Sequence, residues 1–401
     1  MPRVSSISLF SRKFATVAAI RSTVLLACLG GLIGCVSNVD RGAGPAFDPS
    51  LISGERIFDS PVAEAEIPAA EVLAVDAEMR EFVRSHVRTG APASRRFGDL
   101  LAGMATAGLT GPDYDADRTL TAAETFHAGT GNCLSFTNMF IALAREADLD
   151  AVYQVIDVAP DWDAESGFLI RYTHVNVLVR KVRLGKIYDN TVTVDFNEVR
   201  PAPDFRRRVI SDSDAEALYH ANLGISLIRA GGARRGFGHL RRAILLAPQN
   251  VDLWINLGAV YATQGDNDSS MEAYRVALQI EPDSRAAMAG LARGYEKAGD
   301  AERAAFYRSR VNDYLEKNPY YHYAVARTAF DEGNDALALE AVEKAIALRG
   351  RIGRFHFLKG LVEERQGRAD AARASFQTAE RLGLENEAKR AYIRDFVGYN
   401  P

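Results

Sequence analysis

The sequence predicts two folded parts of different class, an α+β domain over residues 76–205 and an all-α solenoid over residues 213–388. In the first part a helical apolar period changes, after residue 150, to an alternating period of two. In the second part small residues recur at a spacing of 34. The length of 401 residues suits two or three domains, and a net charge of −4 gives no reason to expect a nucleic-acid partner.

Residues 1–34 have the pattern of an export signal. Four basic residues precede the apolar stretch "STVLLACLGGLIGC", which is too short to span a bilayer as a stable helix. The motif "LIGC", ending at Cys35, resembles the lipobox of bacterial lipoproteins. That resemblance implies cleavage before Cys35, lipidation of Cys35 and anchoring to a membrane, and Val36 favours the outer membrane by the family's sorting rule. We therefore expect a bacterial envelope protein facing the periplasm; an ordinary signal peptide or membrane anchor is the alternative.

Residues 35–75 are rich in Gly, Pro, Ala and Asp and show no sustained period. This composition is typical of a linker. We expect a flexible tether between the anchor and the first domain.

The α+β domain is predicted from helices followed by strands. Asp76 can cap a helix, a second helix is expected over residues 97–109 and a short third one around Phe126, and a fourth begins at Cys133. Strands are expected over residues 151–158, 168–182 and 186–196, with Gly185 turning the last two into a hairpin. Helices that precede an antiparallel sheet predict an α+β fold.

Cys133 follows the turn "GTGN" and opens a helical pattern. The chain has three cysteines; Cys28 would leave with the signal and Cys35 would carry lipid, so Cys133 has no partner for an intramolecular disulfide. An intermolecular bridge and an inert buried thiol both remain open. The third possibility is a nucleophile, because a helix N-terminus and a neighbouring imidazolium favour a thiolate.

His174 lies in the middle of the longest predicted strand, and Asp195 lies on the polar face of the next strand. A hairpin turned near Gly185 would bring the two together, with Asp189 as a second candidate partner for the ring. Both residues could equally serve a structural purpose.

The order and spacing of these three residues, within "GNCLSFTNMFIALAREADL", "HVNV" and "VDFN", resemble the transglutaminase-like superfamily over residues 80–200. The resemblance implies a papain-like site in which Cys133 is the nucleophile, His174 the general base and later acid, and Asp195 the residue that sets the His174 tautomer. The oxyanion would bind the backbone N–H of Cys133 and one upstream donor, for which His127 is a weak candidate. Asn176 departs from the family, where a Trp often follows the histidine.

Residues 113–124 place Asp113, Asp115, Asp117 and Glu124 at calcium-ligand positions of an EF-hand loop. Arg118 stands where the loop's sharp turn requires glycine, so we expect helix capping instead, with no metal site and no cofactor.

The C-terminal half repeats with a period of 34. One series comprises Gly224, Gly258, Ala292, Ala326 and Gly360, and a second comprises Gly231, Gly265, Gly299, Gly333 and Gly367. This period and the segment "WINLGAVY" (254–261) resemble the tetratricopeptide repeat family over residues 217–386. Five helix pairs would stack into a solenoid, and the tail 389–401 would cap the last pair.

A solenoid of this kind has a concave groove lined by its first helices. By register the groove should include Ile255, Arg293, Tyr320, Tyr323, Arg327 and Phe357, which suit a protein or peptide partner of some acidic character. The alternative is that the tyrosines pack between repeats. The sequence thus predicts an envelope lipoprotein with a thiol-dependent acyl-transfer or hydrolase domain and partner-recruiting repeats, or else a non-catalytic scaffold in which both domains bind proteins.

Overall fold

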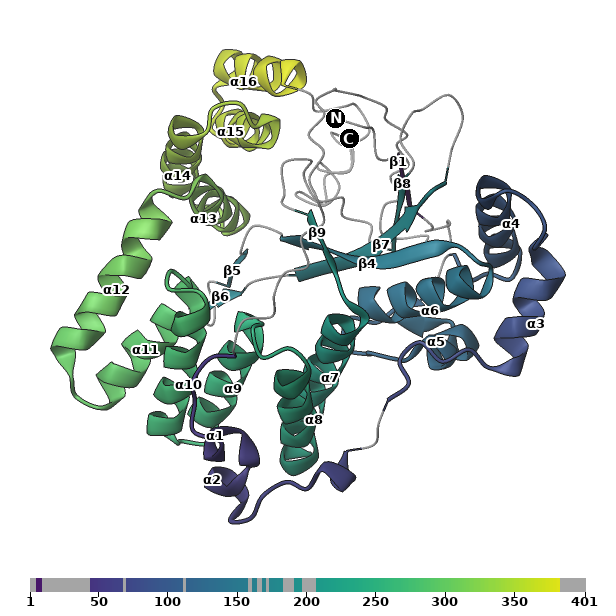
Figure 1. Cartoon of the computed structure of the whole chain (residues 1–401). Helices are drawn as coiled ribbons and strands as arrows, with labels where there is room; N and C mark the ends of the chain where they lie inside the picture. The colour runs from purple at the N-terminus through teal and green to yellow at the C-terminus, as the bar shows by residue number, and fades with distance from the viewer. Residues whose placement is uncertain are drawn as a thin grey trace, which may run out of the picture. The chain divides into compact units, whose positions relative to one another are not determined.

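The computed structural model describes residues 5–8, 44–67, 70–110, 113–157, 161–163, 168–170, 173–182, 191–196 and 207–382. They fall into two compact units. The first contains the main sheet and the helices up to α10, and the second contains α12 to α16 with the ribbon β5–β6 (Figure 1). Cys35, Asp189 and the tail 389–401 lie outside the described residues.

The main sheet has five strands in the order β1-β8-β7-β4-β9. The strands are β1 (Ser5–Ser8), β4 (Asp150–Asp157), β7 (Thr173–Arg180), β8 (Thr191–Asp195) and β9 (Arg207–Ile210). β8, β7 and β4 pair antiparallel, as the sequence predicts. β9 also pairs antiparallel with β4, although it lies beyond residue 205, where the sequence places the end of the domain, and β1 runs parallel to β8. β1 comes from residues that the sequence assigns to the leader.

Helix α6 (Cys133–Glu146) packs against the sheet, with α3 (Ala77–His86), α4 (Ala93–Thr106) and α5 (Ala122–Ala128) around it (Figure 1). Every residue of α6 from Leu134 to Ala144 is buried, because the helix lies between the sheet and the other helices. The rings of Phe136 and Phe140 lie 5.8 and 5.9 Å from that of Phe196, just beyond β8. This core fixes the start of α6 relative to the strands. The second helix of the group begins and ends slightly earlier than the expected range 97–109.

The single strand expected over residues 168–182 is wrong. Phe168–Ile170 forms β6, which pairs with β5 (Asp161–Asp163), whereas Thr173–Arg180 forms β7 of the main sheet. The two pieces belong to different compact units, so a continuous period of two in the sequence does not correspond to one continuous strand.

Residues 44–67 are packed, although the sequence predicts a tether there. They form α1 (Ser50–Ser53), α2 (Glu55–Phe58) and the 3-10 turn η1 (Glu64–Glu66). Leu51 and Val62 are fully buried, and the hydroxyl of Tyr261 donates to the Leu51 carbonyl at 2.8 Å. The ring of Phe47 lies 4.7 Å from that of Trp254. We refer to residues 44–67 as the N-terminal strap, because they run along helices α8 to α10.

The repeats form helix pairs as predicted. The pairs are α7 (Asp212–Arg229) with α8 (Ala233–Leu246), α9 (Val251–Thr263) with α10 (Asn267–Ile280), α11 (Arg285–Lys297) with α12 (Ala301–Glu316), α13 (Pro319–Asp331) with α14 (Asp335–Leu348), and α15 (Gly353–Arg365) with α16 (Ala369–Arg381). The second glycine series has positive φ and ends each first helix, a conformation that favours glycine. In the first series a Cβ on Gly258 would lie 2.7 Å from the ring of Tyr274, so the two helices of that pair approach too closely for a larger residue.

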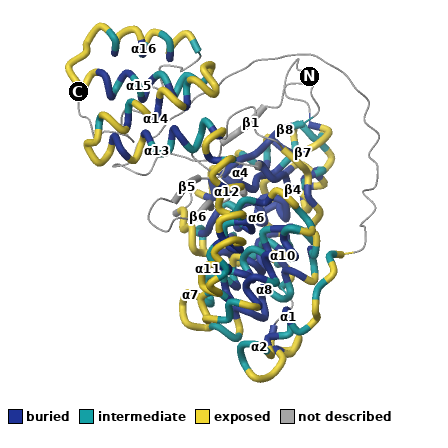
Figure 2. The backbone as a smooth tube through the Cα atoms, turned by 90° about the vertical axis from the view of Figure 1, so that its left-hand side faces the viewer, coloured by how far each residue is buried: buried dark blue, intermediate teal, exposed yellow. Residues whose placement is uncertain are grey.

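Burial follows this architecture (Figure 2). Buried residues run through α6 and the central strands, whereas α16 is mostly exposed. Within the described part of the chain, none of the helices has the length and apolar character needed to cross a membrane.

Candidate functional site

Cys133 is the first residue of α6 and a free, half-buried thiol. The helix starts there because Asn132 is its N-cap, with a side-chain oxygen that accepts from the Ser135 backbone N–H at 3.1 Å. Gly131 before the cap has a φ of 149°, and a Cβ on it would lie 2.7 Å from the Ser135 side chain. The turn that presents the thiol therefore requires both the cap and the glycine.

The segment before α5 is fastened against this helix start. The Asn132 backbone N–H donates to the Arg118 carbonyl at 3.0 Å, and its side-chain amide donates to the Thr119 hydroxyl at 2.6 Å. The Ser135 hydroxyl accepts from the Leu120 N–H at 2.8 Å. These bonds bridge two segments more than ten residues apart in sequence and hold Cys133 in one place.

His174 on β7 and Asp195 on β8 lie together, as the hairpin predicts. The His174 Nε2 atom is 2.7 Å from an oxygen of Asp195, and both residues are buried, with 6% and 9% of their surface exposed. The other oxygen of Asp195 accepts from the Asn176 side-chain amide at 3.0 Å. Continuing the register of β7 and β8 places Asn176 directly opposite Asp195, so the carboxylate is held by two partners from the neighbouring strand.

The third residue, Cys133, adjoins the same ring. Burial alone would lower the pKa of His174, but the hydrogen bond that its ring donates to Asp195 and the interaction with the Cys133 thiol outweigh burial and raise that pKa to about 9. Because Nε2 of His174 is bonded to Asp195, Nδ1 is the ring nitrogen that can exchange a proton with the Cys133 sulfur. The structure thus brings Cys133, His174 and Asp195 together in the order that a papain-like site requires.

Asn176 is the residue of this site whose contact the sequence analysis missed. It was singled out only as a departure from the family pattern. Its amide oxygen is buried with no hydrogen-bond partner among the described residues, as is that of Gln154, which pairs with it across β4 and β7. Its bond to Asp195 follows from the register of the two strands, which the sequence alone does not give.

Two other sequence candidates point elsewhere. The His127 Nε2 atom is 2.6 Å from an oxygen of Asp76, which also caps α3, so His127 is engaged away from Cys133. In the loop that resembles an EF-hand, Glu124 forms a capping box with Thr121. Among the described residues, no group of three or more His, Cys, Asp or Glu side chains is placed to hold a metal ion.

The predicted groove residues divide into two kinds. Tyr323 and Phe357 are buried, with 8% and 1% of their surface exposed, and their rings pack on Phe355 and Phe376 respectively. Tyr323 on α13 thus packs against α15 of the next pair, as the alternative interpretation holds, whereas Phe357 on α15 packs against α16 of its own pair. Ile255, Arg293 and Tyr320 are half-buried, whereas Arg327 is exposed.

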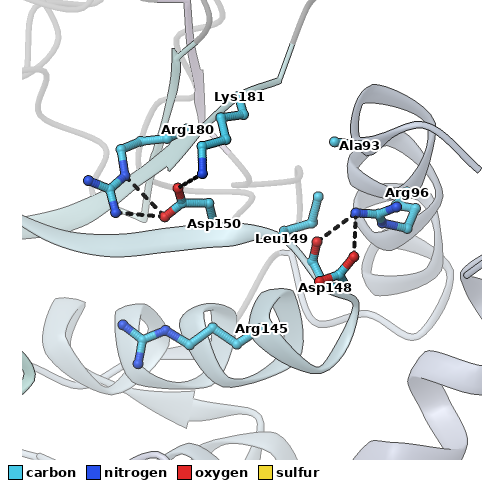
Figure 3. Close-up of a pocket in the computed structure, with 8 residues that line it drawn as sticks. All are labelled: Ala93, Arg96, Arg145, Asp148, Leu149, Asp150, Arg180 and Lys181. Atoms are coloured by element: carbon cyan, nitrogen blue, oxygen red, sulfur yellow. Dashed lines mark hydrogen bonds and ion pairs between the residues drawn. The ribbon is translucent and has the colours of Figure 1, made fainter.

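A pocket of about 430 Å³ lies at the other end of α6 from Cys133 (Figure 3). Its cations are already paired, since Arg180 and Lys181 both contact Asp150 and Arg96 contacts Asp148. Arg145 at the end of α6 pairs with Asp212. The pocket is therefore not a strong anion site, and it is separate from the Cys133 site.

Comparison with known proteins identifies the repeats. Residues 222–285 and 323–384 match one sequence model of the tetratricopeptide repeat, and residues 262–328 match another. The C-terminal half therefore carries tetratricopeptide repeats, as the period of 34 predicts. Such repeats generally mediate binding to a protein partner.

Individual relatives add little beyond the repeats. Tetratricopeptide repeat protein 37 of Xenopus laevis is 25% identical over 141 residues, which are 32% of this chain and 9% of that protein. A crystal structure of MamA protein is 20% identical with a TM-score of 0.24, covering 43% of this chain and 94% of that one. MamA 41-end from Desulfovibrio magneticus RS-1 is 16% identical with a TM-score of 0.25, covering 43% and 96%. At these TM-scores the likeness supports no conclusion about function.

Proposed function

We propose that this chain is a recruitment protein of the bacterial cell envelope whose tetratricopeptide repeats bind a protein or peptide partner. The matches to the repeat models over residues 222–384 carry this proposal. They favour the scaffold interpretation over the enzymatic one, because they concern the repeats alone. A strain that lacks the protein tests it: complementation by Cys133→Ala at wild-type level supports a scaffold, and failure of a stably expressed Cys133→Ala chain argues against a purely non-catalytic role.

A second function is favoured by one specific observation, the His174–Asp195 bond of 2.7 Å beside a half-buried thiol at the start of α6. We propose that this transglutaminase-like site performs thiol-dependent acyl transfer. His174 takes the thiol proton, and the Cys133 sulfur bonds to the carbon of an amide or other acyl group, whose π electrons move to the oxygen. Collapse breaks the bond to the leaving group, which takes its proton from His174, and leaves a thioester.

Water completes the cycle in this proposal. His174 removes a proton from the water, whose oxygen bonds to the thioester carbon, and the thiolate leaves and is reprotonated. Throughout the cycle Asp195 holds the His174 ring, and Asn176 holds the carboxylate of Asp195. Hydrolysis is the favoured outcome over transfer to an amine, because the residues described around the thiol specify no amine-acceptor site.

The alkylation rate of Cys133 tests the second proposal without a known substrate. At pH 7 iodoacetamide should modify Cys133 much faster than free cysteine, and His174→Ala should slow the reaction about tenfold or more. Equal rates for the wild-type chain, the variant and free cysteine would remove the enzymatic interpretation.

The location is a separate proposal that depends on Cys35. We propose cleavage before Cys35 and a lipid on that residue, with the folded units in the periplasm beside the outer membrane. Cleavage would also remove β1 and leave β8 as an edge of the sheet. Metabolic labelling with radioactive palmitate should label the wild-type chain and not Cys35→Ser.

A further inference from the structure

Tyr114 is held beside the start of α6 by a short pair of strands. In the parallel pair β2 (Asp113–Tyr114) and β3 (Thr130–Gly131), Tyr114 is the register partner of Gly131, two residues before Cys133. The next backbone N–H, of Asp115, donates to the Gly131 carbonyl at 3.1 Å. The backbone of Tyr114 is therefore fixed relative to the thiol.

The side chain of Tyr114 faces the backbone amide of Cys133. Its phenolic oxygen lies near that N–H, and 46% of the residue is exposed. Tyr114 is therefore a partly exposed side chain that lies next to the thiol an acyl group must reach.

We propose that Tyr114 is the second oxyanion donor of the Cys133 site, acting together with the backbone N–H of Cys133. This inference rests on the acyl-transfer function proposed above. In the resting site the phenolic oxygen of Tyr114 lies against the backbone N–H of Cys133. When a substrate carbonyl oxygen takes that N–H, the phenol turns its own O–H onto the same oxygen, so the negative charge that forms there is bound by two donors.

The chemical state of the phenol suits a donor. Burial and the charge of Cys133 raise the pKa of Tyr114 to about 12, so the hydroxyl keeps its proton at neutral pH. The support is also rigid, since the segment that follows Tyr114 is bonded to Asn132 and Ser135. His127, the other upstream candidate, is bonded to Asp76.

Two reactions of the full-length protein in detergent separate this role from others. Acylation of Cys133 by p-nitrophenyl acetate passes through a tetrahedral oxyanion: the sulfur bonds to the acetyl carbon, and nitrophenolate leaves with its electron pair. Alkylation by iodoacetamide displaces iodide and forms no oxyanion. Both are followed on the Cys133 peptide by mass spectrometry.

We expect Tyr114→Phe to slow acylation by about 10- to 100-fold while changing alkylation less than threefold. Tyr219→Phe, which removes a hydroxyl from a tyrosine on α7, is the matched control and should change neither rate. An unchanged or faster acylation of Tyr114→Phe overturns the donor role, as does an equal fall in both rates. If the wild-type chain alkylates no faster than free cysteine, the proposed acyl-transfer function itself has failed and Tyr114 loses its role with it.

Discussion

Two buried histidines in the first repeat should make the stability of the first unit sensitive to acid. His220 on α7 and His239 on α8 have 0% and 3% of their surface exposed, and their Nδ1 atoms are 2.8 Å apart. One Nδ1 must donate and the other accept, so the accepting ring is neutral. Burial, His239 and Arg242 lower the pKa of His220 to about 3.

The charged groups around the pair do not reverse this effect. Glu216 lies 3.7 Å from the His220 Nε2 atom but also pairs with Arg242 at 3.2 Å. Burial, Arg235 and Arg242 lower the pKa of His239 as well. Both rings therefore resist protonation in the folded protein.

The sign and size follow from proton linkage. In the unfolded chain a histidine titrates near pH 6.5, whereas folded His220 titrates near 3, so its contribution to stability is present above 6.5 and is lost as the pH falls. Between pH 7 and pH 5 the unfolded state takes up most of a proton at this site and the folded state takes up none. The free energy of unfolding should fall by about 2 kcal/mol over this interval from His220 alone.

Urea unfolding followed by the fluorescence of buried Trp254, at pH 7 and pH 5, measures the effect. His220→Asn is the comparison, because it does not titrate and keeps a polar atom near the Nδ1 position. The difference between the two chains cancels other titrating groups, such as His174, whose raised pKa acts in the opposite direction. Wild-type and His220→Asn chains that lose the same stability on acidification would refute the reasoning.

Three further outcomes are expected. Asp195→Asn removes the carboxylate that holds His174, so the pKa of His174, measured by NMR titration, should fall well below 9. Alkylation of Cys133 at pH 7, followed by mass spectrometry, should slow about tenfold. Arg56→Ala removes the 2.6 Å bond from the strap to Glu272; the strap should loosen by about 1–3 kcal/mol and be cut earlier in limited proteolysis. Gly258→Ala forces a methyl against a ring of α10, and unfolding of the first unit should cost about 1–3 kcal/mol less.

Periodicity made much of the fold predictable. The repeats could be located because a unit of 34 residues occurs five times, and each occurrence is an independent sign of the same helix pair. The start of α6 was predictable because Asn132 and Gly131 encode it locally. The sheet contacts of His174 and Asp195 followed from alternation along two strands.

Features fixed by tertiary contact were not predictable in this way. The N-terminal strap has helices of only four residues, and its order comes from surfaces such as Trp254 and Phe237 that lie far along the chain. Tyr114 belongs to a pair of two-residue strands, too short to show a period. Tyr323 and Phe357 were wrongly assigned to the groove. The helix register predicts the direction in which a side chain points, but not whether a neighbouring helix packs against it.

The two proposed functions place different demands on the first unit. A scaffold has no need of a buried imidazole–carboxylate pair, since apolar residues of similar volume stabilise a core at least as well. In this chain the pair adjoins a half-buried thiol, and Asn176 donates a hydrogen bond to its carboxylate. A histidine with a strongly shifted pKa beside a thiol is typical of a catalytic site. The repeats explain how a partner is bound; the arrangement around Cys133 is the part of the molecule that binding alone leaves unexplained.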